Sequence, residues 1–246
     1  MIFGWWRRKK VSHGWSIGTD GTKVPYRPFY PIVAEADRRF IGDTIALFIA
    51  NGLRPVAGVP VDELIDRVCE EAVRFGYQDD GQSPKRWLDV GKHHRYQVLS
   101  LLANEQETHG KLAKPPHSGP IFENARRFED HCLDGAVDYY SSLVGALCAM
   151  SGGGLHFSDI EEHFDTDTGI VALTLKRHGE ANVISLRYGK DVDWSILKTI
   201  GAYLVPGAVG RFGSIFDGGA LVVYASPEQL DKLGTIIDLN FWHEQA

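Results

Sequence analysis

The sequence predicts a mixed α+β protein, in which a helical, bundle-like first half packs on a small, mostly antiparallel sheet with two helices. Two patterns predict this class. Apolar side chains recur at spacings of three and four through residues 31–151, which is typical of helices. Residues 169–189 instead alternate apolar and polar side chains, which is typical of strands. The period changes at the glycines of residues 152–154, so we place a region boundary there.

Residues 1–30 are expected to form a basic, aromatic N-terminal arm. They hold six Lys or Arg residues against one acid, and their Gly, Pro and aromatic residues interrupt any helical pattern. The Trp and basic residues of positions 5–10 suit an anionic membrane or nucleic acid, or serve only as solubilising charges. Because these aromatics precede the basic residues, the order differs from that of a signal peptide.

Four helices are expected in residues 31–151, each with an apolar stripe on one face. They run from Pro31 to Asn51-Gly52, from about residue 62 to 75, from Ser83-Pro84 to Gly110, and from about Pro120 to Met150. Proline suits the first turn of a helix and glycine its end, which is where the pattern places them. Four such helices predict a bundle.

Residues 155–246 are expected to form an α+β region in the order hairpin, helix, hairpin, helix, strand. The first hairpin spans residues 169–189, with its turn in the segment RHGEAN. Asp193 is expected to cap the first helix, and Asp217-Gly218-Gly219 to make the second hairpin turn. We expect these elements to form one sheet covered by its helices.

The end of this region carries the pattern of a capped helix followed by a strand. Ser226, Pro227 and Gln229 match an N-cap, a first helical position and the third residue of a capping box. Gly234 is expected to end this helix, and residues 235–241 alternate well enough to predict a last strand.

Composition indicates a globular protein whose body is acidic. The chain has 246 residues, 43% of them hydrophobic, and a net charge of −6. No uncharged apolar run is long enough to span a membrane, and the three cysteines form no close pair. A cytoplasmic location with buried free thiols is therefore expected. Acidic charge disfavours nucleic acid and favours basic partners, although solubility alone also accounts for it.

The densest polar cluster, residues 156–167, admits three interpretations. A solvated connection between the two halves needs no ligand. A partner-binding acidic patch would use Glu161, Glu162, Asp165 and Asp167. A metal site would use His156, Asp159, His163 and Asp165, with Asp159 and His163 sharing a helical face at a spacing of four. A calcium loop starting at Asp165 is excluded, since its glycine is one place early and its twelfth position is Lys176.

No catalytic motif is found elsewhere. The chain has no nucleophile elbow, no phosphate-binding loop and no inward Glu-x-x-His repeat, and its cysteines fall on apolar stripes. The sequence therefore favours a non-catalytic protein-binding module without a cofactor, acting as a bacterial immunity protein does when it neutralises a toxin. A metal-dependent hydrolase that uses the cluster of residues 156–167 is the alternative. The pattern sets neither the partner nor the oligomeric state.

Overall fold

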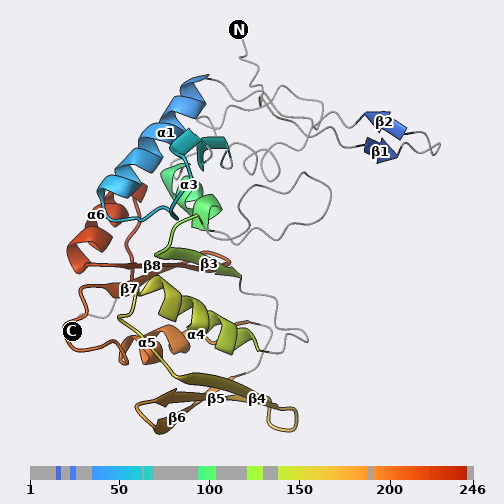
Figure 1. Ribbon diagram of the computed structural model, residues 1–246, viewed down its shortest axis with the longest axis vertical. Coiled ribbons are helices and arrows are strands. Elements are labelled where there is room, and N and C mark those ends of the chain that lie inside the picture. The colour runs from blue at the N-terminus through green and yellow to red at the C-terminus, as the bar shows by residue number, and fades with distance from the viewer. Residues whose placement is uncertain are drawn as a thin grey trace. The chain divides into compact units, whose positions relative to one another are not determined.

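The computed structural model describes residues 15–17, 23–25, 35–62, 64–66, 68, 94–103, 121–129, 138–187 and 191–242 (Figure 1). The chain divides into two compact units. The first contains Met1–Leu47 and Ala57–Ile121, and the second contains Phe48–Val56 and Phe122–Ala246. Helices and antiparallel strands both occur, which confirms the mixed α+β class. In the described ranges, every helix is too short or too polar to cross a bilayer.

The first unit carries a small hairpin and helices. Strands β1 (Trp15–Ile17) and β2 (Lys23–Pro25) pair antiparallel within the predicted arm. Helix α1 (Glu35–Ala50) confirms the first predicted helix, and its last turn belongs to the second unit. Helix α3 (His94–Ala103) confirms the middle of the third, whereas the second is helical at residues 61–62, 64–66 and 68. The other parts of the predicted bundle, and residues 1–14 of the arm, lie outside the described residues.

The fourth predicted helix is wrong over its first half. Residues Ala125–Glu129 form strand β3, and helix α4 begins only at Tyr139 and ends at Met150. β3 pairs antiparallel with a strand almost a hundred residues later, Ala125 facing Val223. Pairing at that range overrides the local apolar spacing, which continues from Phe128 toward α4. Both β3 and α4 belong to the second unit, on the N-terminal side of the three glycines.

The second unit is built from two antiparallel sheets of three strands each. The first sheet has the order β4 (Asp159–Asp165), β5 (Ile170–Arg177), β6 (Glu180–Arg187). The second has the order β3, β8 (Gly219–Ala225), β7 (Arg211–Phe216). Helix α5 (Ser195–Gly201) follows the first sheet, and α6 (Pro227–Ile237) follows the second. The sequence therefore predicted one sheet where the chain makes two.

Helices α4 and α5 lie between the two sheets (Figure 1). One apolar core includes side chains of both helices and of both sheets: Leu143, Leu147, Ile196 and Ile200 with Val171, Leu173, Leu175, Phe212, Val222 and Tyr224. Leu147 and Val222 are completely buried. This arrangement explains why α4 has no charged residue, because it contacts apolar neighbours on two sides.

Both predicted hairpins are confirmed. β5 and β6 are joined by His178 and Gly179, which both have positive φ, 53° and 84°, as a tight type I′ turn requires. β7 and β8 are joined at Asp217-Gly218. The next residue, Gly219, must be glycine, because a Cβ there would lie 2.5 Å from the carbonyl oxygen of Phe128 on β3.

The start of α6 matches the sequence, whereas its end does not. Ser226 and Gln229 form the reciprocal capping box, and Pro227 occupies the first turn. The helix continues through Gly234 to Ile237 and ends at Asp238, whose φ of 58° is left-handed. The predicted strand over residues 235–241 is therefore wrong. Among the described residues that follow α6, Trp242 pairs with Ser214 of β7 as an isolated bridge.

Asp193 was predicted to be the N-cap of α5, but it lies one residue before the N-cap. The N-cap position of α5 is Trp194, while the Asp193 carboxylate accepts hydrogen bonds from the Ser195 N–H and hydroxyl. It also accepts one from the Arg187 N–H at the end of β6. The burial of Asp193 opposes its ionisation, but the hydrogen bonds from Ser195 and Arg187 outweigh it and lower the pKa of this carboxyl. Asp193 thus joins the first sheet to α5.

Candidate functional site

The acidic cluster lies on a strand, and the helical face expected for Asp159 and His163 is wrong. Because side chains alternate along β4, these two share one face with Glu161 and Asp165. We call this side of the sheet, away from α4 and α5, the outer face. The register adds Ile170, Ala172, Thr174 and Lys176 of β5 and Ala181, Val183, Ser185 and Arg187 of β6.

Lys176 organises the first part of the outer face. Its ammonium group donates to Asp159 and to Glu161, each at 2.8 Å. The two carboxylates, Asp159 first, raise the pKa of Lys176, and Lys176 lowers the pKa of Asp159. All three groups are solvent-accessible, so the arrangement orients the carboxylates more than it stabilises the fold.

The second part of the outer face is a turn held by its own carboxylate. Asp165 accepts hydrogen bonds from the Thr168 hydroxyl at 2.8 Å and from the Asp167 N–H at 2.9 Å. The Thr168 hydroxyl contributes most to lowering the pKa of Asp165, and the Asp167 N–H follows. Asp167 itself is exposed beside it. The Asp165 carboxyl is thus ionised in ordinary buffers.

Glu162 does not belong to the outer face, which corrects the set of four residues expected to form the patch. Its side chain lies on the core side of β4 and accepts a hydrogen bond from the Ser141 N–H at 2.8 Å. Ser141 is in the first turn of α4, where N–H groups lack partners within the helix. Burial raises the pKa of Glu162 above its ordinary 4.5, against the hydrogen bonds from Ser141. Glu162 therefore joins β4 to α4.

Replacing Glu162 with alanine is expected to lower the free energy of unfolding by about 1 kcal/mol, because the first turn of α4 loses its acceptor. Glu162→Gln keeps an acceptor oxygen but no titrating group. Since the folded chain raises the pKa of Glu162, protonation favours folding; this contribution is complete below pH 4.5 and disappears as pH rises through the raised value. Urea unfolding between about pH 4 and pH 8 measures this. Identical pH profiles of wild type and Glu162→Gln would contradict it.

The four residues of the metal alternative are not brought to one point. Asp159 and Asp165 lie at opposite ends of β4, about 20 Å apart along the strand. His156 precedes the strand and is exposed. Across the described ranges, no group of three or more His, Cys, Asp or Glu residues is placed to hold a metal ion. Asp159, the member of that set nearest to Lys176, instead belongs with the acidic groups of the outer face.

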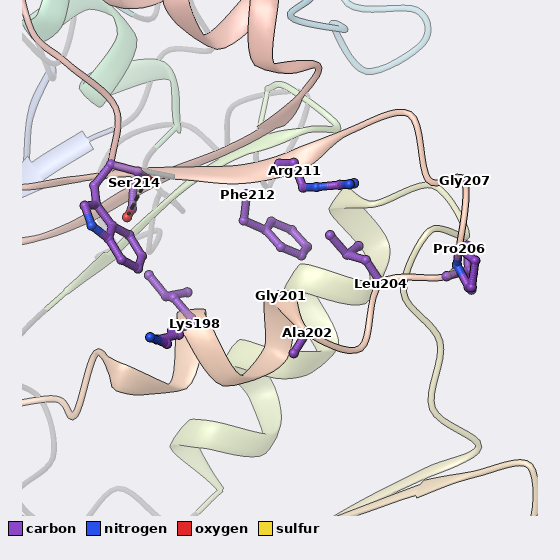
Figure 2. A pocket seen from close by; sticks show the side chains of 12 residues that line it. Lys198, Gly201, Ala202, Leu204, Pro206, Gly207, Arg211, Phe212 and Ser214 are labelled. Atoms are coloured by element: carbon purple, nitrogen blue, oxygen red, sulfur yellow. Dashed lines mark hydrogen bonds between the residues drawn. The ribbon is translucent and has the colours of Figure 1, made fainter. Parts of the chain in front are cut away.

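A cavity of about 300 Å³ lies between α5, the following loop and β7 (Figure 2). Its wall is formed by Leu197, Lys198, Gly201, Ala202, Leu204, Val205, Pro206, Gly207, Arg211, Phe212, Ser214 and Trp242. Arg211 donates to the carbonyl oxygens of Ala208 and Gly210, so it fixes the loop. None of these lining residues is Asp, Glu, His or Cys, so they offer no pair for acid–base catalysis at neutral pH.

Of the three cysteines, the structure describes Cys148. It is half-buried on α4, and burial raises the pKa of its thiol, which disfavours the reactive thiolate. Cys69 and Cys132 lie outside the described residues.

Comparison of the chain with protein family models, with curated proteins and with solved structures finds no match. The geometry and charge of the outer face are therefore the basis for its proposed function.

Proposed function

We propose that this protein is a non-catalytic binding module that holds a basic partner protein against its outer face, as an immunity protein holds a toxin. The observation that carries the proposal is the acidic row: Asp159, Glu161, Asp165 and Asp167, all on one side of the first sheet or in its turn. One cation, Lys176, lies among these four carboxylates. The acidic row thus keeps a net negative charge that would attract a basic partner.

Apolar groups beside the acidic row supply the other requirement of a protein interface. Ile170 on β5 and Val183 on β6 are 41% and 64% exposed, respectively. Both lie on the outer face: Ile170 pairs directly with Asp165 of β4, and Thr174 of β5 lies between Val183 and Glu161. Apolar contact gives affinity, whereas surrounding charge gives orientation and speed of association. This combination supports a protein partner over a small ion.

Charge reversal of the acidic row is expected to weaken partner capture at least 10-fold. The test variant carries Asp159→Lys, Glu161→Lys, Asp165→Lys and Asp167→Lys. A matched control carries Asp43→Lys, Asp62→Lys, Asp191→Lys and Asp217→Lys, four exposed acids that belong neither to the first sheet nor to its turns. The two sets change net charge equally, so only the position of the charge differs. Capture from a lysate of the source cells, quantified by mass spectrometry, compares them with wild type.

Salt provides a second measurement on the same partner. Because exposed charges are screened over a few ångströms in concentrated salt, wild-type capture should fall strongly by about 0.5 M NaCl. The control variant should lose capture over the same range. A partner retained equally by the acidic-row variant and the wild type would remove the outer face from the function.

A further inference from the structure

The side of β6 that faces away from β5 carries unused backbone groups. Arg187 shows their direction: its N–H donates to Asp193 at 3.2 Å and its carbonyl oxygen accepts from the Tyr140 hydroxyl at 3.1 Å. Neither partner is on β5. In an antiparallel strand every second residue points its N–H and C=O to the same side. The backbone groups of Ala181, Val183 and Ser185 therefore point away from β5 as well.

The hairpin turn gives the same assignment independently. In a two-residue turn, the residues flanking it form a hydrogen-bonded pair, here Arg177 and Glu180. The alternation then leaves Ala181, Val183 and Ser185 without bonds to β5. Within the described part of the chain, no strand pairs with β6 on this side, and no hydrogen bond uses those three backbone positions. We call the three residues the free edge.

The two edge strands of this sheet differ in protection. β4 carries five ionisable side chains in seven residues, a device that keeps edge strands from pairing with other chains. β6 is eight residues long, and the six residues between Glu180 and Arg187 contain no charge and no proline. Its register with β5 is continuous, without a bulge. Natural edge strands rarely lack all of these protections, so the free edge is suited to pairing.

We propose that the free edge pairs antiparallel with the free edge of a second copy of this chain, about a two-fold axis at Val183. Val183 then faces Val183 of the second copy, and Ala181 faces Ser185, so each facing pair has its hydrogen-bonding groups on the shared side. The antiparallel direction also sets the Glu180 end of one strand beside the Arg187 end of the other. The two Glu180 residues are thereby kept at opposite ends of the paired strands, as are the two Arg187 residues, whereas a parallel arrangement in register would bring like charges together.

The pairing fixes how the two outer faces are related. Each odd-numbered residue faces an odd-numbered one and each even-numbered residue an even-numbered one, and the odd-numbered residues of β6 lie on the outer face. The two sheets therefore join into one of six strands, with both outer faces on the same side and one β4 strand at each end. This association does not compete with the proposed function, since it uses the backbone edge of β6 and leaves both the acidic row and the Val183 side chain on the outer face.

The test is the mass and amide exchange of the full chain as a function of its concentration. Light scattering after size exclusion should show a rise from the 27.3 kDa monomer to twice that mass. Val183→Pro removes an N–H that β5 does not use, so the sheet should persist while the dimer dissociation constant rises roughly 10- to 100-fold. Val183→Thr keeps the N–H and the branched side chain and should dimerise like wild type. Val183→Lys, which adds a charge to the edge, should weaken the dimer without any proline effect.

Hydrogen exchange identifies the surface directly. The amides of Ala181, Val183 and Ser185 should exchange freely at low concentration and become protected when the dimer forms. A wild-type protein that stays monomeric at millimolar concentration overturns the proposal. So does a dimer that Val183→Pro and Val183→Lys leave intact, or one in which these three amides stay unprotected. The acidic-row variant leaves Val183 and the edge of β6 unchanged, so partner capture by that variant is a separate readout and either proposal can fail alone.

Discussion

Asn124→Ala is expected to lower the free energy of unfolding by about 3 kcal/mol or more, because a buried side-chain amide with three bonds disappears. The Asn124 side chain is completely buried, and its oxygen accepts from the Arg54 N–H at 2.9 Å. Its amide nitrogen donates to the carbonyl oxygens of Gly52 and Tyr224, at 3.0 and 2.9 Å. Alanine would leave one donor and two acceptors unsatisfied at a position that joins three segments of the second unit.

Urea unfolding followed by circular dichroism measures this change. Asn240→Ala is the matched control, since Asn240 is exposed and its replacement should change stability by less than about 0.5 kcal/mol. Equal stability of the Asn124→Ala variant and the control would show that water replaces the lost partners, and would contradict a dry site.

Leu147→Ala should destabilise the protein to a similar degree, by about 3 kcal/mol. Leu147 is 0% exposed and belongs to the core that α4 shares with both sheets. Shortening it removes buried methyl groups and leaves a cavity between layers that cannot close without moving one sheet. The expected cost therefore exceeds that of an apolar residue packed on one side only.

Val209→Ala is the control for this second variant, because Val209 is 86% exposed and its truncation leaves no cavity. Thermal and urea unfolding of both variants, compared with wild type, give the difference. A loss below about 1 kcal/mol for Leu147→Ala would mean that the layers collapse onto the shortened side chain, contrary to a rigid three-layer core.

Where the structure depends on residues that are close together in the chain, the sequence was sufficient to predict it. The alternation of β5 and β6 and the Ser226–Gln229 capping box depend on neighbours within a few residues, and the structure confirms both. β3 could not be found in this way. Its residues continue a plausible helical spacing, and only the register with β8 makes them a strand.

The acidic row was predicted in part. Glu161 and Asp167 are exposed and Asp165 is half-buried at the end of β4, but Glu162 points toward α4 and Asp159 takes its place on the outer face. Charged residues on both faces of β4 hide its period of two, because the core side accepts a carboxylate that caps a helix. The apolar Ile160 and Phe164, two places to either side of Glu162, were the signal that could have shown the strand.

Gly234 shows a different kind of error. The sequence suggested a helix stop, yet a Cβ there would lie 2.7 Å from the carbonyl oxygen of Leu239, and the Leu239 N–H donates to Gly234. The glycine allows the returning chain to approach the helix closely. A glycine that admits a close neighbour and one that ends a helix look the same in sequence, because the neighbour is set by the fold.

The pairing of β3 with β8 also bears on how this protein is made. Residues 125–129 leave the ribosome long before residues 219–225, so the second sheet cannot close until residues 219–225 have also been made. Until then α4 lacks one of its two covers and exposes apolar surface to the cell. A nascent chain in that state is a natural client for chaperones, and recombinant fragments that stop before residue 225 should be recovered mainly as aggregates.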